Sequence, residues 1–193
     1  MKLEVNSRPP ACPRWELAGA IFIVSVFLLV NLLVATRTPT VYVDEPQYCD
    51  PAANLFLGDG FTSTMWGQGR GDFWCGNAPF YQGILDGFFK IFGFGLFRAR
   101  AVNSLLAGAG GLLIWAALRR TAFVRQPANR LLCLALVLSG SVTTLTFRTI
   151  RPDTTMFFTC AMVFFACSLP AGWRGRYVLV GLASACCPRR ASR

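Results

Sequence analysis

The sequence has 193 residues, of which 54% are hydrophobic and 15% are charged, and its formal net charge is +10. Charge is confined to short clusters between long apolar runs, which is not the pattern of a soluble domain, and the mean hydropathy is +0.47. Lys and Arg stand at the ends of the apolar runs and form no basic face with interleaved aromatic residues, so a nucleic-acid partner is not expected. The composition therefore predicts an all-α, polytopic transmembrane helical protein.

The absence of histidine narrows the chemistry further. Ser-His-Asp and Cys-His nucleophile systems are excluded, and so is any metal site that needs a His ligand. Acid-base chemistry would have to use Asp, Glu, Lys, Tyr or Cys.

The first predicted element is a transmembrane helix over residues 15–36, which follows a polar, basic N-terminal segment of residues 1–14. Its apolar core, Leu17–Ala35, is long enough to cross a bilayer. A signal peptide has a shorter apolar region of ~7–15 residues, and no small-residue cleavage site follows here. We therefore expect this helix to be retained.

Residues 37–98 are predicted to form a loop outside the membrane that contains two amphipathic helices lying in the interface. Asp50 and Pro51 are typical of a helix start, with Asp50 as the N-cap. Gly58 is typical of a helix stop. The second helix is predicted over Pro79–Phe92.

Residues 99–187 are predicted to hold the second, third and fourth transmembrane helices and part of a fifth, at Ala99–Leu118, Leu131–Phe147, Thr154–Leu169 and Tyr177–Cys187. The last of these has about 11 residues, which cover only ~16 Å of a hydrocarbon layer ~30 Å thick. A basic tail, residues 188–193, follows at once. We therefore expect the chain to be cut short by a premature stop, a frameshift or a gene-boundary error.

The positive-inside rule predicts a cytoplasmic N-terminus, because this orientation also makes the basic connections of residues 119–130 and 174–176 cytoplasmic. The acidic loop and the connection of residues 148–153 then both emerge on the outer face.

Two groups of ionisable residues lie in these outer segments. Asp44 and Glu45 either begin an ordinary solvated loop or belong to a polar reaction site at the membrane surface. Arg148, Arg151 and Asp153 either form a turn that opens the next helix, with the arginines as interfacial anchors, or belong to the same site. Ionisable groups gathered on one face near membrane depth favour the site.

Cysteines in this outer loop leave one further alternative open. Cys49 and Cys75 form a disulfide if the loop faces an oxidising compartment and the geometry permits it.

An ordered set of segments carries a resemblance to a known family. It consists of the first apolar helix, Asp44-Glu45 with Tyr48, then DPAANLFLGDGFT, NAPFYQGILDGFFKIFGFG, RARAVN at the second span and RTIRPD between the third and fourth. In this order they resemble the N-terminal part of the membrane glycosyltransferases of the C-type fold. The similarity is to family 39, which includes protein O-mannosyltransferases and the bacterial aminoarabinose transferase that acts on lipid A. It covers residues 15–173, and family members carry many more spans.

This resemblance implies a transferase that moves a sugar from a polyprenyl-phosphate-linked donor to a lipid, glycan or protein acceptor, in the inner membrane of a bacterium. Asp44 corresponds to the family's candidate catalytic base, and Glu45 either assists it or binds a divalent cation, which is the only cofactor considered. Arg148 and Arg151 are the candidates for binding the donor phosphate. Further candidate site residues are Asp153 and Tyr48.

Two other classes of function are weighed against this one. A transporter of lipid-linked sugars needs ionisable residues inside its spans, and Leu17–Ala35 and Leu131–Phe147 contain none. A non-catalytic assembly subunit would use the loop acids for partner contact. We expect little activity from the 193 residues alone, because absent spans would build the rest of the donor groove.

Overall fold

The computed structural model describes residues 13–42, 44–65, 72–73, 79–121, 123–170, 172–173 and 175–186. Within these ranges the chain contains eight α-helices and no strand. The predicted all-α class is therefore confirmed. One isolated antiparallel bridge joins Thr62 to Phe73 in the connection after the second helix.

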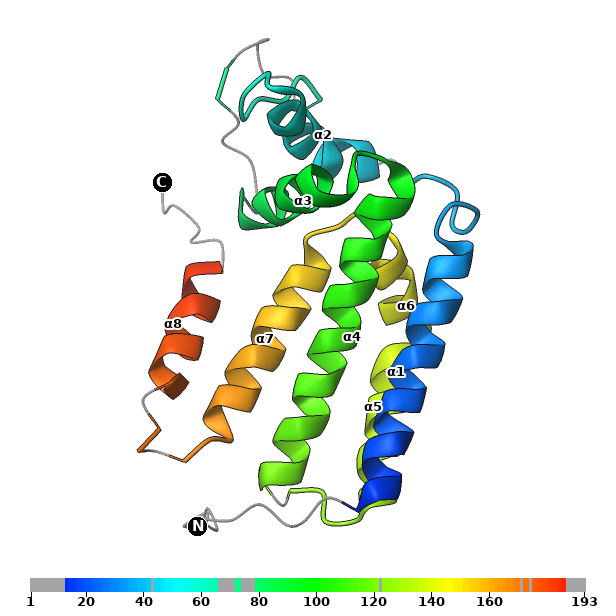
Figure 1. The fold of residues 1–193 in the computed structure, drawn as a ribbon, viewed down its shortest axis with the longest axis vertical. Coiled ribbons are helices and arrows are strands. Elements are labelled where there is room, and N and C mark those ends of the chain that lie inside the picture. Colours follow the sequence, from blue (N-terminus) through cyan, green and yellow to red (C-terminus); the bar gives the residue numbers. More distant parts are fainter. Residues whose placement is uncertain are drawn as a thin grey trace.

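Two helices are long and apolar enough to cross a membrane, judged by length and composition: α1, Arg14–Val34, and α4, Leu96–Thr121. Shorter helices run beside them: α5, Pro127–Ser139; α6, Ser141–Arg148; α7, Asp153–Cys167; and α8, Gly175–Cys186. These helices run along one axis, with α1, α5, α6 and α8 pointing one way and α4 and α7 the other (Figure 1).

Helix α4 occupies the centre of this bundle because small residues along it admit neighbouring side chains. A Cβ added at Gly110 would come within 2.6 Å of the Phe157 ring, and one at Gly111 within 3.1 Å of Leu134. Close packing of α4 against α5 and α7 thus depends on glycine at these two positions. The apolar core is built around the same helix and includes Val24, Phe27, Ala107, Trp115, Leu134, Leu138 and Phe147.

The third predicted span differs from the structure. The sequence predicts one helix over Leu131–Phe147, whereas the chain forms α5 and α6 with a break at Gly140. Gly140 has an extended ψ of 134°, so the helical hydrogen-bond ladder stops there. The apolar pattern continues across the break and did not reveal it.

Helices α2, Asp44–Leu57, and α3, Pro79–Phe92, lie across one end of the bundle (Figure 1). The bounds of α3 agree with the prediction, and Gly58 ends α2 with a φ of +91°, as expected.

The predicted start of α2 at Asp50 is wrong, because the helix begins at Asp44 and contains Pro51. Asp50 does not act as an N-cap. Its Oδ2 accepts a hydrogen bond of 2.7 Å from the Ser63 hydroxyl and so ties the helix to the loop that follows.

Candidate functional site

The end of the bundle under α2 and α3 also receives the α6–α7 connection of residues 149–152 (Figure 1). The acidic pair at the start of α2 and the segment that contains Arg151 therefore lie at the same end of the bundle, as the sequence-based topology requires.

Glu45 forms a buried, bidentate ion pair with Arg100 of α4. The Arg100 Nε donates to Glu45 Oε2 at 3.0 Å, and Nη2 donates to Oε1 at 2.8 Å. Both side chains are only 1% exposed. Charge-assisted pairs of this geometry are the strong class of hydrogen bond, and they fix direction as well as distance. Since Arg100 engages both carboxylate oxygens, the structure favours a positioning role for Glu45 over cation binding.

The remaining guanidinium nitrogen of Arg100 holds the α1–α2 connection. Its Nη1 donates to the backbone oxygens of Ala35, at 2.8 Å, and Pro39, at 2.9 Å. One side chain of α4 thus fastens the end of α1, the connection and the first turn of α2. That first turn carries Asp44, so the ion pair determines where the Asp44 backbone lies.

Four of the predicted site residues lie at this end of the bundle, and Tyr48 of α2 packs against the apolar cluster that contains Ile150 of the α6–α7 connection. Burial raises the pKa of the Tyr48 hydroxyl, the positive charge of Arg151 opposes the rise, and the negative charges of Asp153 and Asp44 add to it. The Arg151 Nε also donates to Asp153 Oδ2 at 2.9 Å. Arg151 and Asp153 keep 34% and 46% of their side chains exposed, so the cluster has a solvent-facing side. The structure therefore joins Asp44 and Tyr48 of α2 to the α6–α7 connection.

Asn103 of α4 holds that connection in place. Its side-chain amide donates to the backbone oxygen of Thr149 and to that of Arg151, the latter at 3.2 Å. Asn103 is fully buried and lies three residues after Arg100, on the same face of α4. A single helix face thus positions both halves of the cluster.

Tyr81 of α3 brings a second buried hydroxyl to this region. Burial, and after it the nearby Cys49, raise the pKa of Tyr81 well above its ordinary value, while the Asn103 side chain opposes the rise. The Asn103 side chain therefore lies close to the Tyr81 hydroxyl, and neither that hydroxyl nor the Asn103 side-chain oxygen meets the geometry of a full hydrogen bond. The two buried polar groups lie together between α3 and α4.

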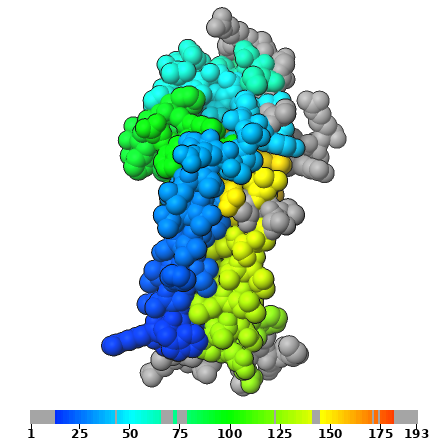
Figure 2. Space-filling model, turned by 90° about the vertical axis from the view of Figure 1, so that its right-hand side faces the viewer, coloured from blue at the N-terminus to red at the C-terminus, as the bar shows by residue number. Residues whose placement is uncertain are grey.

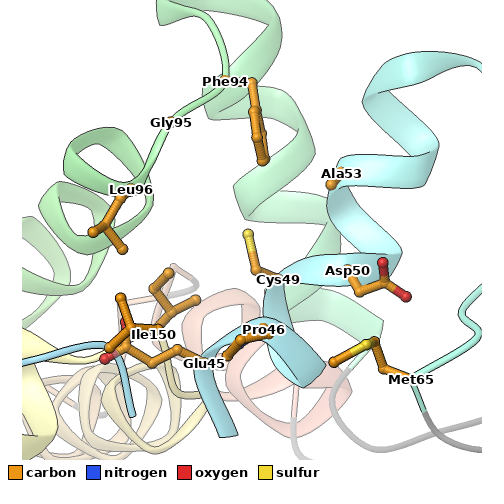
Figure 3. Close-up of a pocket in the computed structure, with 11 residues that line it drawn as sticks. Glu45, Pro46, Cys49, Asp50, Ala53, Met65, Phe94, Gly95, Leu96 and Ile150 are labelled. Atoms are coloured by element: carbon orange, nitrogen blue, oxygen red, sulfur yellow. The ribbon is translucent and has the colours of Figure 1, made fainter. Parts of the chain in front are cut away.

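A cavity of about 360 Å³ opens beside the ion pair, between α2 and the α3–α4 connection (Figure 3). Phe94 enters it from that connection and Cys49 faces it from α2. Burial raises the pKa of the Cys49 thiol to about 12, with further contributions from Asp50 and Glu45. The walls are mostly apolar and comprise Val41, Glu45, Pro46, Cys49, Asp50, Ala53, Met65, Phe94, Gly95, Leu96 and Ile150.

Cys49 has a free thiol in this structure. Cys75, its suggested disulfide partner, lies outside the described residues.

Arg148 is placed apart from the cluster. It ends α6 and its Nε donates to the Asn31 side-chain oxygen of α1 at 2.7 Å. No described contact joins it to Asp44 or Arg151. Its predicted role in binding the donor phosphate therefore has no geometric support here, whereas Arg151 lies in the cluster.

Sequence reasoning missed Arg100 and Asn103, which hold the site together, and Tyr81, which adds a buried hydroxyl to it. It also missed Asn31, which binds Arg148 away from the cluster. A signal was present for the first two, because Arg100 and Asn103 are three residues apart at the entrance of a predicted span, where charged and amide groups are costly. The partner of Arg100 lies 55 residues away and is not a sequence neighbour.

A metal site is not formed by side chains in the described ranges, where no three His, Cys, Asp or Glu residues gather closely enough to hold an ion.

Comparisons with protein-family models, with curated proteins and with solved structures give no match for this chain.

Proposed function

We propose that this chain is a polytopic membrane glycosyltransferase, or the N-terminal part of one, that takes a sugar from a polyprenyl-phosphate-linked donor. The observation that supports the proposal is the convergence of Asp44 and Tyr48 with Arg151 and Asp153 at one end of the bundle. These groups come from two segments far apart in the chain. A carboxylate, a guanidinium and a neutral hydroxyl are the groups that such a transfer needs.

Asp44 is the proposed general base. An acceptor hydroxyl must lose a proton as it attacks the anomeric carbon of the donor sugar, and a carboxylate held in position takes up that proton. Asp44 is partly buried in the first turn of α2. The Glu45–Arg100 ion pair holds this turn, so Glu45 acts as a positioning residue and not as a second base.

Arg151 is the proposed phosphate ligand. When the glycosidic bond breaks, negative charge develops on the departing lipid phosphate, and a guanidinium stabilises that charge. Tyr48 is the proposed hydrogen-bond donor to the sugar or phosphate: its ordinary pKa of 10.0 already keeps the hydroxyl protonated at neutral pH, and burial raises that pKa further. Asp153 orients Arg151 through their hydrogen bond.

The membrane arrangement belongs to the proposal as well. Helices α1 and α4 have the length and composition of membrane spans, and the apolar helices α5 and α7 lie parallel to them. We place the N-terminus in the cytoplasm and the α2–α3 end at the outer face of a bacterial inner membrane. The amphipathic helix α3 then lies at the boundary where a lipid-linked sugar meets water.

The test is transfer of a radiolabelled sugar from its polyprenyl phosphate to acceptor lipid or peptide, with the reconstituted chain in excess over donor so that a single slow turnover is detected. Asp44→Asn should lower the rate by about 10²–10⁴-fold while donor binding is kept. Asp59→Asn, an exposed acid in the loop after α2, is the matched control and should keep the native rate. Native-like transfer by Asp44→Asn would remove the catalytic assignment and leave the assembly-subunit alternative.

A further inference from the structure

A groove of about 380 Å³ runs along the side of the bundle between α1 and α5–α6. One wall is a row of α1 side chains spaced by four residues, Phe22, Val26 and Val30, which extends over ~12 Å. Figure 2 shows α1 and α5 side by side on this face. The opposite wall belongs to α5 and includes Ala135 and Ser139.

The outer surface of this groove is apolar and exposed. Phe22 is 69% exposed, and Val26 and Val30 are each 42% exposed. Apolar side chains in this arrangement are covered by hydrocarbon when α1 spans a membrane. The groove therefore opens toward lipid and not toward the cluster around Asp44.

The end of the groove nearest to α2 carries a positive charge. Arg148 and Asn31 line the groove there. The half-buried Arg148 guanidinium donates a hydrogen bond of 2.7 Å to the neutral side-chain oxygen of Asn31. Arg100, Arg130 and Arg151 each bind a carboxylate. Arg148 forms no ion pair with the part of the chain that the structure describes. A half-buried cation without a counter-charge is costly, and an anionic ligand at this position would offset the cost.

We propose that the groove binds an anionic phospholipid of the surrounding bilayer, with one acyl chain between α1 and α5 and the phosphate on Arg148. A guanidinium presents its N–H groups in the geometry that phosphate oxygens accept, and the side chain keeps further N–H donors beyond the one given to Asn31. The bilayer supplies this ligand at high local concentration, so modest affinity is enough for occupancy. The bound lipid would pack against the chain beside the break at Gly140. This inference rests on the membrane placement proposed above and does not depend on the catalytic assignment.

The test is lipid binding by native mass spectrometry of the full chain, with phosphatidylglycerol and phosphatidylcholine of identical acyl chains as probes. The native chain should retain phosphatidylglycerol about fivefold better than phosphatidylcholine. Arg148→Gln should abolish this preference and Arg148→Lys should keep part of it. Arg98→Gln, which removes an exposed arginine from the same end of the bundle, is the charge control and should keep the full preference.

The apolar part of the site is tested separately by Val26→Trp, which fills the groove and leaves Arg148 unchanged. It should lower retention of both lipids, whereas Leu29→Trp, at an exposed α1 position outside the groove, should not. If Arg148→Gln fails to fold, the comparison of Val26→Trp with Leu29→Trp still tests whether a lipid occupies the groove.

Three results would overturn the proposal: equal retention of the two lipids by the native chain, equal losses in the control variants, or displacement of phosphatidylglycerol by polyprenyl phosphate, which would make the groove a donor site. Loss of sugar transfer in Asp44→Asn is independent of all three, so the failure of either proposal is recognised separately.

Discussion

Each end of the helical bundle holds a buried Arg–Glu ion pair, and the two pairs are built alike. At one end Arg130 donates to Glu16 through Nε at 2.7 Å and Nη2 at 2.8 Å, and its Nη1 holds the backbone oxygens of Val124 and Arg125. At the other end Arg100 binds Glu45 in the same manner, with Nη1 on the α1–α2 connection. Both arginines thus join two helices and one connection.

The surroundings of the two pairs differ. Glu16 is fully buried, Trp115 donates to its carboxylate at 3.2 Å, and the Arg119 guanidinium lies 5.0 Å from the centre of the Trp115 ring. Around Glu45 lie partly exposed charges, the two buried polar groups between α3 and α4, and a cavity. The ion pair therefore stabilises the fold at both ends of the bundle. The candidate function belongs to the groups beside the Glu45–Arg100 pair.

The largest effect is expected from breaking either pair. Arg100→Met leaves the buried Glu45 carboxylate without its ion-pair partner, which costs about 3–5 kcal/mol of unfolding free energy.

Arg130→Met should cost less, because Glu16 keeps the Trp115 hydrogen bond and the Arg119 guanidinium at 3.9 Å. Reversible unfolding in mixed micelles measures the loss. Arg98→Met, at an exposed position, should change stability by less than ~0.5 kcal/mol.

The same two variants should also differ in their effect on donor binding. Arg100→Met should displace α2 and weaken donor binding, while Arg130→Met should leave donor binding intact in the fraction that remains folded. Equal effects of the two variants on donor binding would contradict the asymmetry between the ends.

A smaller effect is expected from alkaline pH at the site end alone. The Cys49 pKa is about 12 in the folded chain, against an ordinary value of 9.0. Since the folded pKa is raised, the stabilisation that comes from keeping the thiol neutral is fully present below pH 9 and is lost as pH rises toward 12. Unfolding free energy measured from pH 8 to 11 should fall more steeply for the native chain than for Cys49→Ala. Identical slopes for the native chain and Cys49→Ala would refute the assignment.

The titration of Tyr48 tests whether Arg151 and Asp153 lie close to this side chain. Arg151→Gln removes the charge that opposes the rise of the Tyr48 pKa, so this pKa should increase, and Asp153→Asn should decrease it. Carbon-13 NMR of labelled tyrosine measures both shifts. A Tyr48 pKa that responds to neither substitution would place the α6–α7 connection away from α2.

The smallest effect is expected from the exposed pair at the site, Arg151 and Asp153. A double-mutant cycle on unfolding free energy should give a coupling of about 0–1 kcal/mol, because both side chains are largely hydrated. A coupling above ~2 kcal/mol would show that the cluster is closed to water like the Glu16 end.

Composition and apolar runs were sufficient to predict an all-helical chain and the approximate bounds of α1, α3, α4 and α7. They were sufficient because helix length and amphipathicity are local properties, expressed within a few turns. The expected alternation of helices also brought Asp44 and the residue 148–153 connection to one end of the bundle.

Only the tertiary structure decided which charges pair. Glu45 and Arg100 are 55 residues apart, and Glu16 and Arg130 are 114 apart, so no local spacing rule relates them. The start of α2 differs from the local signal at Asp50, because Glu45 in the preceding turn pairs with Arg100 of α4. The break at Gly140 is likewise not expressed in the apolar pattern of Leu131–Phe147. A buried charge takes whichever partner folding brings within reach, because desolvation makes an unpaired position costly.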